Sequence, residues 1–401
     1  MPAQGATAPI RPGHSPYPSG GTTVEGLTVD AANQGAQLAD DVSYRIKASW
    51  RAQPPLCPNA GGDTPASISV VGSRTVVVDL QYQCAYLSAY NTSTGALLWR
   101  HKYSAAGSES ANLINGVLYF TTYDANRDPI VEEVDPATGL LKWSSPDNAY
   151  DQAEPSIGSG VLARANRLVS ATTGKQTCIA SLHPNADTDG ASLVADGRLF
   201  YNSDGSVNAY NPTNCALDWS FRKSSANVTA PGSGTALPAY HNGLLYVRSL
   251  YDTATVVLNP NTGTQVATLP TSDQPIAFDG AIGIFTATPL NSSATVSAVN
   301  LSTAHVYWSR TLPRVVIDKF GDTEPTTLYA PPLIEDGLIW TENAVDTGLP
   351  AHIDAWDEVT GATRSSTVEP CNAQYGQSEL AIAQHRVFAV SNCGVLTYTP
   401  S

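Results

Sequence analysis

Residues 89–99 read AYNTSTGALLW, and residues 133–143 repeat the pattern as EVDPATGLLKW. In both stretches a strand-like segment runs into a Thr-Gly turn, and a Trp stands four residues after the Gly. Weaker copies follow, so that the Gly position recurs at intervals of roughly 35 to 57 residues. Such a period predicts stacked units that share one core. The weaker copies are LVSATTGKQTC, AYNPTNCALDW, VLNPNTGTQVA, AVNLSTAHVYW and AWDEVTGATRS.

A second pattern alternates with the first and predicts a tight hairpin in every unit. It joins two short apolar segments through a tight turn, as in ASLVADGRLFY and LPAYHNGLLYV. Eight copies are present, and the turn carries Gly in seven of them and His385 in the last. Glycine adopts positive φ at such turns without a Cβ clash, and Asp-Gly and Asn-Gly are strong hairpin signals. Two strands here and two around the Thr-Gly turn make a four-stranded antiparallel sheet, which is one blade of a β-propeller.

The eighth unit lacks its outer strand, because the chain reaches Ser401 before another Thr-Gly turn. Residues 44–50 (YRIKASW) have the spacing of such a strand, with Trp50 in the Trp position. An N-terminal strand that completes the C-terminal blade would close the ring and remove an exposed edge. We therefore expect an all-β, eight-bladed propeller over residues 43–401, preceded by a flexible Pro/Gly/Ser-rich tail and surface segment over residues 1–42.

The repeat resembles that of the quinoprotein-like propellers, a family that includes the PQQ-dependent alcohol dehydrogenases and cofactor-free relatives of the BamB type. The resemblance covers about residues 44–401 and implies the propeller fold, whereas function is not fixed by such a scaffold. In that family the repeat Trp packs against the Gly of the next repeat's turn. The resemblance thus implies that Trp99 packs near Gly139 and Trp143 near Gly174.

Six cysteines, with no C-x-x-C motif, favour disulfides over a metal site. Fifteen pairings are open on paper. In the resembling repeat, Cys178 takes the place of a Trp and Cys215 that of the next Gly, which implies a Cys178–Cys215 bond between neighbouring blades. Similar positions around the hairpins suggest two further bonds and an oxidising, secreted or extracytoplasmic location. These are Cys57–Cys84 and Cys371–Cys393.

Composition narrows the classes of partner. The formal net charge is −14, and the 21 basic residues are scattered, so nucleic acid and anionic membrane surfaces are poor partners. No apolar run approaches the roughly 18 residues that a membrane span needs. We expect a monomer whose partner is a protein, a glycan or a small molecule.

Acidic residues recur just before the first strand of seven of the eight blades, where propeller loops converge on one end of the central channel. Two interpretations stay open: solvated loop acids with no joint role, or an acidic funnel that concentrates a cation or a polyhydroxylated ligand. Blade seven adds an insertion at residues 310–332, and long loops on a rigid scaffold often carry function. The recurring acids are Asp63, Glu109, Glu154, Asp189, Asp273, Glu324 and Glu379, and the insertion adds Arg314, Asp318, Lys319 and Asp322.

No motif identifies a catalytic residue. The adjacent Cys-Cys pair of the resembling quinone enzymes is missing, as is a C-x-x-C-H haem motif, so we expect no cofactor and no PQQ. Calcium stays open as a ligand, although the DANRDP stretch at residues 124–129 has Pro129 where a calcium loop requires Gly. We favour a non-catalytic binding or scaffold protein that uses an acidic channel mouth. The alternative is a secreted lyase, hydrolase or oxidoreductase with its site at that mouth and the blade-seven loops.

Overall fold

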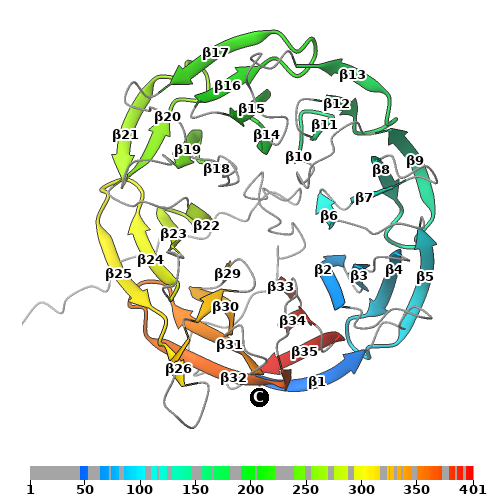
Figure 1. Ribbon diagram of the computed structural model, residues 1–401, viewed down its shortest axis with the longest axis vertical. Coiled ribbons are helices and arrows are strands. Elements are labelled where there is room, and N and C mark those ends of the chain that lie inside the picture. Colours follow the sequence, from blue (N-terminus) through cyan, green and yellow to red (C-terminus); the bar gives the residue numbers. More distant parts are fainter. Residues whose placement is uncertain are drawn as a thin grey trace, which may run out of the picture.

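The computed structural model shows a closed ring of β-sheets around a central axis (Figure 1). No helix occurs among the described residues, and hence none that could cross a membrane. The structure describes residues 46–52, 64–71, 74–80, 85–103, 110–114, 117–123, 129–146, 156–164, 167–180, 191–203, 206–222, 239–248, 254–269, 275–287, 293–316, 323–324, 326–328, 332–335, 337–344, 350–372, 379–383, 386–391 and 394–400.

The first four blades are regular four-stranded antiparallel sheets, in which the strands follow chain order from the axis to the rim (Figure 1). Blade one contains β2 (Thr64–Val71), β3 (Arg74–Leu80), β4 (Ala85–Asn91) and β5 (Leu97–Tyr103). Blade two contains β6 (Ser110–Ile114), β7 (Val117–Tyr123), β8 (Pro129–Val134) and β9 (Leu141–Pro146). Blade three contains β10 (Ser156–Gly158), β11 (Val161–Arg164), β12 (Arg167–Ser170) and β13 (Gln176–Ile179). Blade four contains β14 (Ala191–Ala195), β15 (Arg198–Ser203), β16 (Ser206–Tyr210) and β17 (Leu217–Arg222).

Blades five and six repeat this order, and blade eight takes its outer strand from the start of the described chain. Blade five contains β18 (Ala239–His241), β19 (Leu244–Arg248), β20 (Thr255–Leu258) and β21 (Gln265–Leu269). Blade six contains β22 (Pro275–Asp279), β23 (Ile282–Ala287), β24 (Thr295–Asn300) and β25 (Val306–Thr311). Blade eight contains β33 (Glu379–Ala383), β34 (Arg386–Ser391), β35 (Gly394–Pro400) and β1 (Ile46–Ala52).

Blade seven departs from the regular pattern at its innermost position. Two short strands, β28 (Thr327–Leu328) and β29 (Leu333–Glu335), share the inner edge of β30 (Leu338–Ala344). The sheet continues outward through β31 (Pro350–Asp357) and β32 (Thr363–Asn372). The insertion before the blade forms a small hairpin of β26 (Val315–Val316) and β27 (Thr323–Glu324). It begins later than residue 310, because β25 runs to Thr311 and pairs there with Thr295.

The ring closes as the sequence predicts. β1 pairs antiparallel with β35 from Ile46 opposite Pro400 to Ala52 opposite Val395, with a bulge between Ala48 and Trp50. The first and last described strands therefore share one sheet, which lies at the bottom of Figure 1. The predicted eight-bladed propeller is confirmed, whereas the predicted tail over residues 1–42 lies outside the described residues.

The Thr-Gly turns show why this short motif recurs. In blade one the side chain of Asn91 accepts hydrogen bonds from the backbone N–H groups of Ser93 and Thr94, both at 3.0 Å. The Gly95 N–H donates to the Asn91 carbonyl at 2.8 Å, and Gly95 has a φ of +69°, where glycine meets no Cβ penalty. Asp357 and Gly361 form the same arrangement in blade seven. An Asx residue, a Thr and a Gly thus suffice to reverse the chain.

The hydrophobic core consists of layers between neighbouring blades. Both faces of an inner strand are buried, so alternate residues enter different layers. On β4, for example, Leu87 and Ala89 face blade two, where they meet Leu118 and Phe120. Tyr90 faces blade eight and packs with its core residues. Each blade is therefore stabilised by burial against both of its neighbours.

Candidate functional site

The innermost strands of the eight sheets surround the axis (Figure 1). The sheets run from axis to rim in the same sense, with β28 and β29 sharing the inner position in blade seven, so the innermost strands all begin at one end of the ring, which we call the axial end. Six of the recurring acids shortly precede these strands in the sequence or stand at their start, whereas Glu324 lies in the separate β26–β27 hairpin. Glu379 is the first residue of β33, and Glu324 is in β27, where it pairs with Val315.

Most of the predicted site residues lie outside the described residues. Arg314 is exposed and follows β25 closely, so it stands beside the β26–β27 hairpin. Glu324 lies in the same hairpin, and these two residues of the blade-seven cluster are thus near one another along the backbone. The other predicted members lie outside the described residues: Asp63, Glu109, Glu154, Asp189, Asp273, Asp318, Lys319 and Asp322.

Tryptophan side chains dock neighbouring blades to one another. Each indole lies against the turn glycine of the next blade, so that a Cβ placed at Gly95 would be 2.7 Å from Cε3 of Trp50. Each indole N–H also donates to a carbonyl of the same turn, at 2.8 to 3.3 Å. The contacts that the sequence predicts for Trp99 and Trp143 are confirmed. The five docked pairs are Trp50 on Gly95, Trp99 on Gly139, Trp143 on Gly174, Trp219 on Gly263 and Trp308 on Gly361.

Arginine side chains add a second contact between blades that the sequence reasoning missed. Arg74 Nη1 donates to the Ala137 carbonyl at 2.7 Å, and Arg386 Nη1 donates to the Thr92 carbonyl at 3.1 Å. Arg198 Nη1 donates to Asn261 Oδ1 at 2.7 Å. Each arginine is the first residue of the second strand of its blade and reaches the turn of the next blade. Their shared position in GSRTV, DGRLF and QHRVF was the signal that could have found them.

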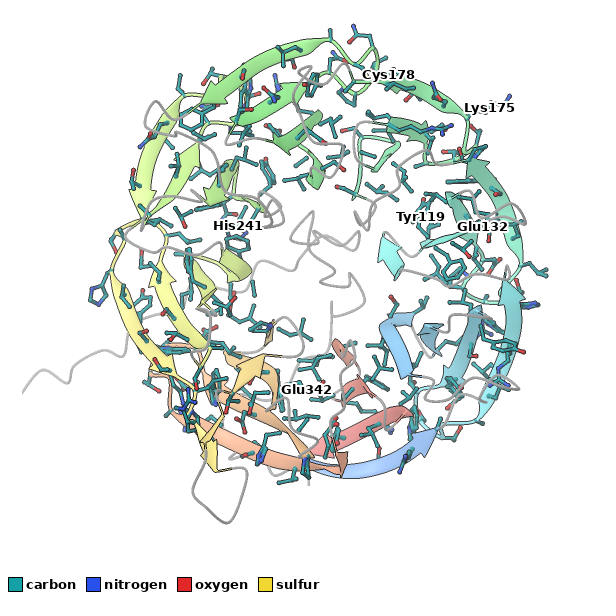
Figure 2. The ribbon with its side chains drawn as sticks, viewed as in Figure 1. Tyr119, Glu132, Lys175, Cys178, His241 and Glu342 are labelled. Carbon is teal, nitrogen blue, oxygen red and sulfur yellow. A yellow bond between two sulfur atoms is a disulfide. The ribbon has the colours of Figure 1, made fainter. Side chains whose placement is uncertain are left out.

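A disulfide replaces the tryptophan dock between blades three and four. Cys178 and Cys215 are bonded, with their Cα atoms 5.9 Å apart, and Cys178 lies on the outer rim of the ring (Figure 2). Cys215 occupies the turn-glycine position with a φ of +56°. The predicted Cys178–Cys215 bond is confirmed. Of the other four cysteines, Cys371 lies near the end of β32, and its side chain is not described. Cys57, Cys84 and Cys393 lie outside the described residues.

We expect the double variant Cys178→Ser/Cys215→Ser to fold but to lose about 3–4 kcal/mol of unfolding free energy. The bond closes a loop with a sequence separation of 37 and joins blades three and four. Its loss therefore raises the conformational entropy of the unfolded chain and removes the covalent link between these two blades. Urea denaturation of the oxidised, reduced and double-variant proteins measures the change. Equal stability of all three would show that the bond contributes nothing to docking.

Several carboxylates are buried between blades, where sequence reasoning placed none. Glu132 is 7% exposed in the layer facing blade one, and burial raises the pKa of its carboxyl although Ser144 hydrogen-bonds it. Its folded pKa lies above the unfolded value, so its burial costs stability at neutral pH and this cost falls as the pH drops through the raised pKa. Glu342 and Glu369, 1% and 3% exposed, lie near Tyr398 in the layer between blades seven and eight.

These buried acids belong to the packing layers of the ring. Burial, Glu369 and Glu342 together raise the pKa of Tyr398, and Glu133 accepts from Trp143 Nε1 at 2.5 Å beside Lys142 at 2.9 Å. Figure 2 shows Glu132 with Tyr119 in blade two and Glu342 in blade seven, so the buried acids occupy separate blades. Trp340 and Trp356 are fully buried packing residues in blade seven.

Among the described residues, no group of three or more His, Cys, Asp and Glu side chains is arranged to hold a metal ion. Asp124, Asn126 and Asp128 lie outside that part of the chain. The calcium and cofactor expectations therefore stay predictions.

Comparison with known proteins places this geometry in a family. The family model described as "Outer membrane protein assembly factor BamB" matches residues 29–182 and 161–367. BamB from Moraxella catarrhalis is 15% identical with a TM-score of 0.60, over 84% of this chain and 96% of that one. A quinohemoprotein alcohol dehydrogenase from Comamonas testosteroni is 10% identical with a TM-score of 0.60, over 95% and 81% of the two chains. A search of curated protein sequences finds no match.

The fold and its docked seams define an eight-bladed β-propeller built from four-stranded sheets. Because the family model covers well over half of the sequence, the chain belongs to the BamB-like family of PQQ-repeat propellers. The solved structures, at these identities, support the fold alone.

Proposed function

We propose that the protein is a non-catalytic extracytoplasmic scaffold that binds a protein partner at the axial end of the ring. The observation that carries this proposal is the arrangement of the innermost strands, which begin together around the axis and which most of the recurring acids precede in the sequence. A closed ring brings strand starts that are far apart in sequence around one opening, and the proposal is that the acids preceding them act together there.

The charge of that end selects the partner. The chain carries a formal net charge of −14, and acids of one sign gathered at one end attract cationic groups and speed their association. A Lys- or Arg-rich segment of a protein fits this surface. Its binding would weaken as salt is added, because exposed charges are screened over about 8 Å at physiological ionic strength.

Family and chemistry both support an extracytoplasmic scaffold. The matching family is described as an outer membrane protein assembly factor, a description that concerns interactions with other proteins. The Cys178–Cys215 bond supports an oxidising compartment.

The proposal includes no quinone. The sequence lacks the adjacent cysteine pair that the resembling dehydrogenases place against the cofactor. The disulfide that the described residues contain lies on the outer rim and joins two blades (Figure 2). We therefore propose that the ring works without a quinone.

We expect the double variant Glu109→Gln/Glu154→Gln to bind a fluorescent deca-lysine peptide about five- to thirtyfold more weakly than the parent protein. Each exposed charge pair contributes up to about 1 kcal/mol, and both acids precede innermost strands of neighbouring blades. Fluorescence anisotropy at low and physiological salt measures the affinity, and urea denaturation should change by no more than about 0.5 kcal/mol.

The matched control is Asp124→Asn/Asp128→Asn, which removes the same charge from the loop between the second and third strands of blade two. It should leave peptide affinity nearly unchanged, whereas Asp322→Asn/Glu324→Gln should weaken it. Equal weakening by the control would reduce the effect to net charge. Binding of a neutral oligosaccharide at the same end would favour a glycan partner, and turnover of a substrate there would favour the enzyme.

A further inference from the structure

The outermost strand of blade one leaves one edge of its sheet open. β5 pairs with β4 along one side, from Leu97 opposite Tyr90 to Tyr103 opposite Ala85. No other described strand pairs with its second side, which lies at the rim of the ring (Figure 1). The backbone N–H and C=O groups of this edge can therefore pair with an added strand, which is a common way of binding extended segments.

Basic residues are concentrated on this edge. Arg100, His101 and Lys102 follow one another in β5, and the chain contains no other run of three Lys, Arg or His residues. The strand has no Asp or Glu. In the outermost strand of blade four, by contrast, Asp218 forms an ion pair with Arg198. A chain with a net charge of −14 thus presents one basic sheet edge.

Four exposed leucines lie at the start of the same strand and at the adjacent turn of blade two. Trp99 packs on Gly139, so the leucines next to these two residues share the rim of one seam. An exposed apolar patch beside charged groups is typical of a surface that binds another protein. The four are Leu97 (48% exposed), Leu98 (42%), Leu140 (59%) and Leu141 (50%).

The register of β5 determines which side chains an added strand would meet on each face. Arg100 lies opposite Ser88 and donates from Nε to the Ser88 hydroxyl at 3.1 Å, while its Nη groups have no hydrogen-bond partner among the described residues. Trp99 is on the other face and packs on blade two. Neighbouring strands pair their side chains face by face. Alternate residues of the added strand would therefore lie beside Arg100 and beside Trp99.

We propose that the open edge of β5 binds an extended protein segment in which acidic and apolar residues alternate. The acidic residues lie on the face of Arg100 and the apolar residues on the face of Trp99. This surface is on the rim, whereas the proposed function uses the axial end, so the inference goes beyond that function.

Charge makes a second copy of this chain a poor occupant of the edge. Arg100 is the middle residue of β5, so twofold antiparallel pairing of two copies would place the two guanidinium groups opposite one another. Like charges directly opposite are destabilising, whereas a carboxylate at that position is attracted. The edge therefore disfavours self-pairing and selects an acidic partner.

Fluorescence anisotropy with the full chain and a labelled decapeptide of alternating Val and Glu tests the proposal. We expect tighter binding than for a decapeptide of alternating Val and Ser, and about two- to fivefold weaker binding by Arg100→Gln. Lys175→Gln is the matched control, because Lys175 is an exposed cation on the rim of blade three (Figure 2), and it should leave the affinity unchanged. The Val–Glu peptide should slow hydrogen exchange in β5 and not in β17.

A second variant, Leu97→Ser, tests the apolar contact without a change of charge. It should weaken the Val–Glu peptide about two- to fivefold, whereas Leu217→Ser, at the start of the outermost strand of blade four, should not. Both should bind deca-lysine like the parent protein. Absence of peptide binding, equal binding of the Val–Ser peptide, or equal weakening by Arg100→Gln and Lys175→Gln would overturn the proposal. Protection outside β5, or a dimer of the parent protein that Leu97→Ser dissociates, would overturn it as well.

Discussion

Removal of residues 1–52 is expected to abolish the folded ring, whereas removal of residues 1–21 should leave its melting temperature nearly unchanged. The longer deletion removes all of β1, and with it the strand that covers the edge of β35. It also removes Trp50, which docks on Gly95 and whose ring centroid lies 6.2 Å from that of Phe388. The open edge would then be free to pair with another molecule.

Circular dichroism melting and size-exclusion chromatography of the two truncated proteins check this prediction. We expect aggregation or a loss of cooperative melting for the longer deletion only. A deletion of residues 1–52 that stays monomeric and melts like the parent protein would refute the role of β1 in closure.

Replacement of Gly139 by Ala is expected to destabilise the protein by about 2–5 kcal/mol. Gly139 has a φ of +72°, which costs a residue with a Cβ about 1–2 kcal/mol. A Cβ there would also lie 2.5 Å from the Trp99 ring, and relief of such overpacking costs about 1–3 kcal/mol. Urea denaturation gives the difference in unfolding free energy.

Gly197→Ala is the matched control, because Gly197 has the same φ of +72° and a Cβ there would meet nothing within 4 Å. It carries the backbone cost alone, about 1–2 kcal/mol. Equal losses in the two variants would mean that the tryptophan dock tolerates a Cβ and does not set the position of the glycine.

The repeat predicted the parts of the fold that depend on local chemistry. The Thr-Gly turns, the hairpin glycines and the outer strand that contains Trp50 each follow from a few residues close together in the sequence. The structure confirms them. The split inner edge of blade seven was not predictable in this way. β28 and β29 are two and three residues long, and both depend on pairing with β30, a partner that carries no local signal for the split.

The buried carboxylates show a similar limit. Glu132 and Glu342 stand inside β8 and β30, and their burial depends on which face of the strand meets the next blade. The sequence predicted which acids recur before the innermost strands, because the intervals between these acids match the intervals between the strands. Whether they act together depends on side-chain positions around the axis, which linear spacing does not determine.

Hydrogen-exchange footprinting of the deca-lysine complex tests the central claim most directly. Binding at the axial end should slow exchange at the starts of the innermost strands β2, β6, β10 and β33, and leave the Thr-Gly turns around Gly139 and Gly263 unchanged. Protection confined to those turns or to the outer strands would contradict the account, because it would place the binding surface at the opposite end or on the rim of the ring.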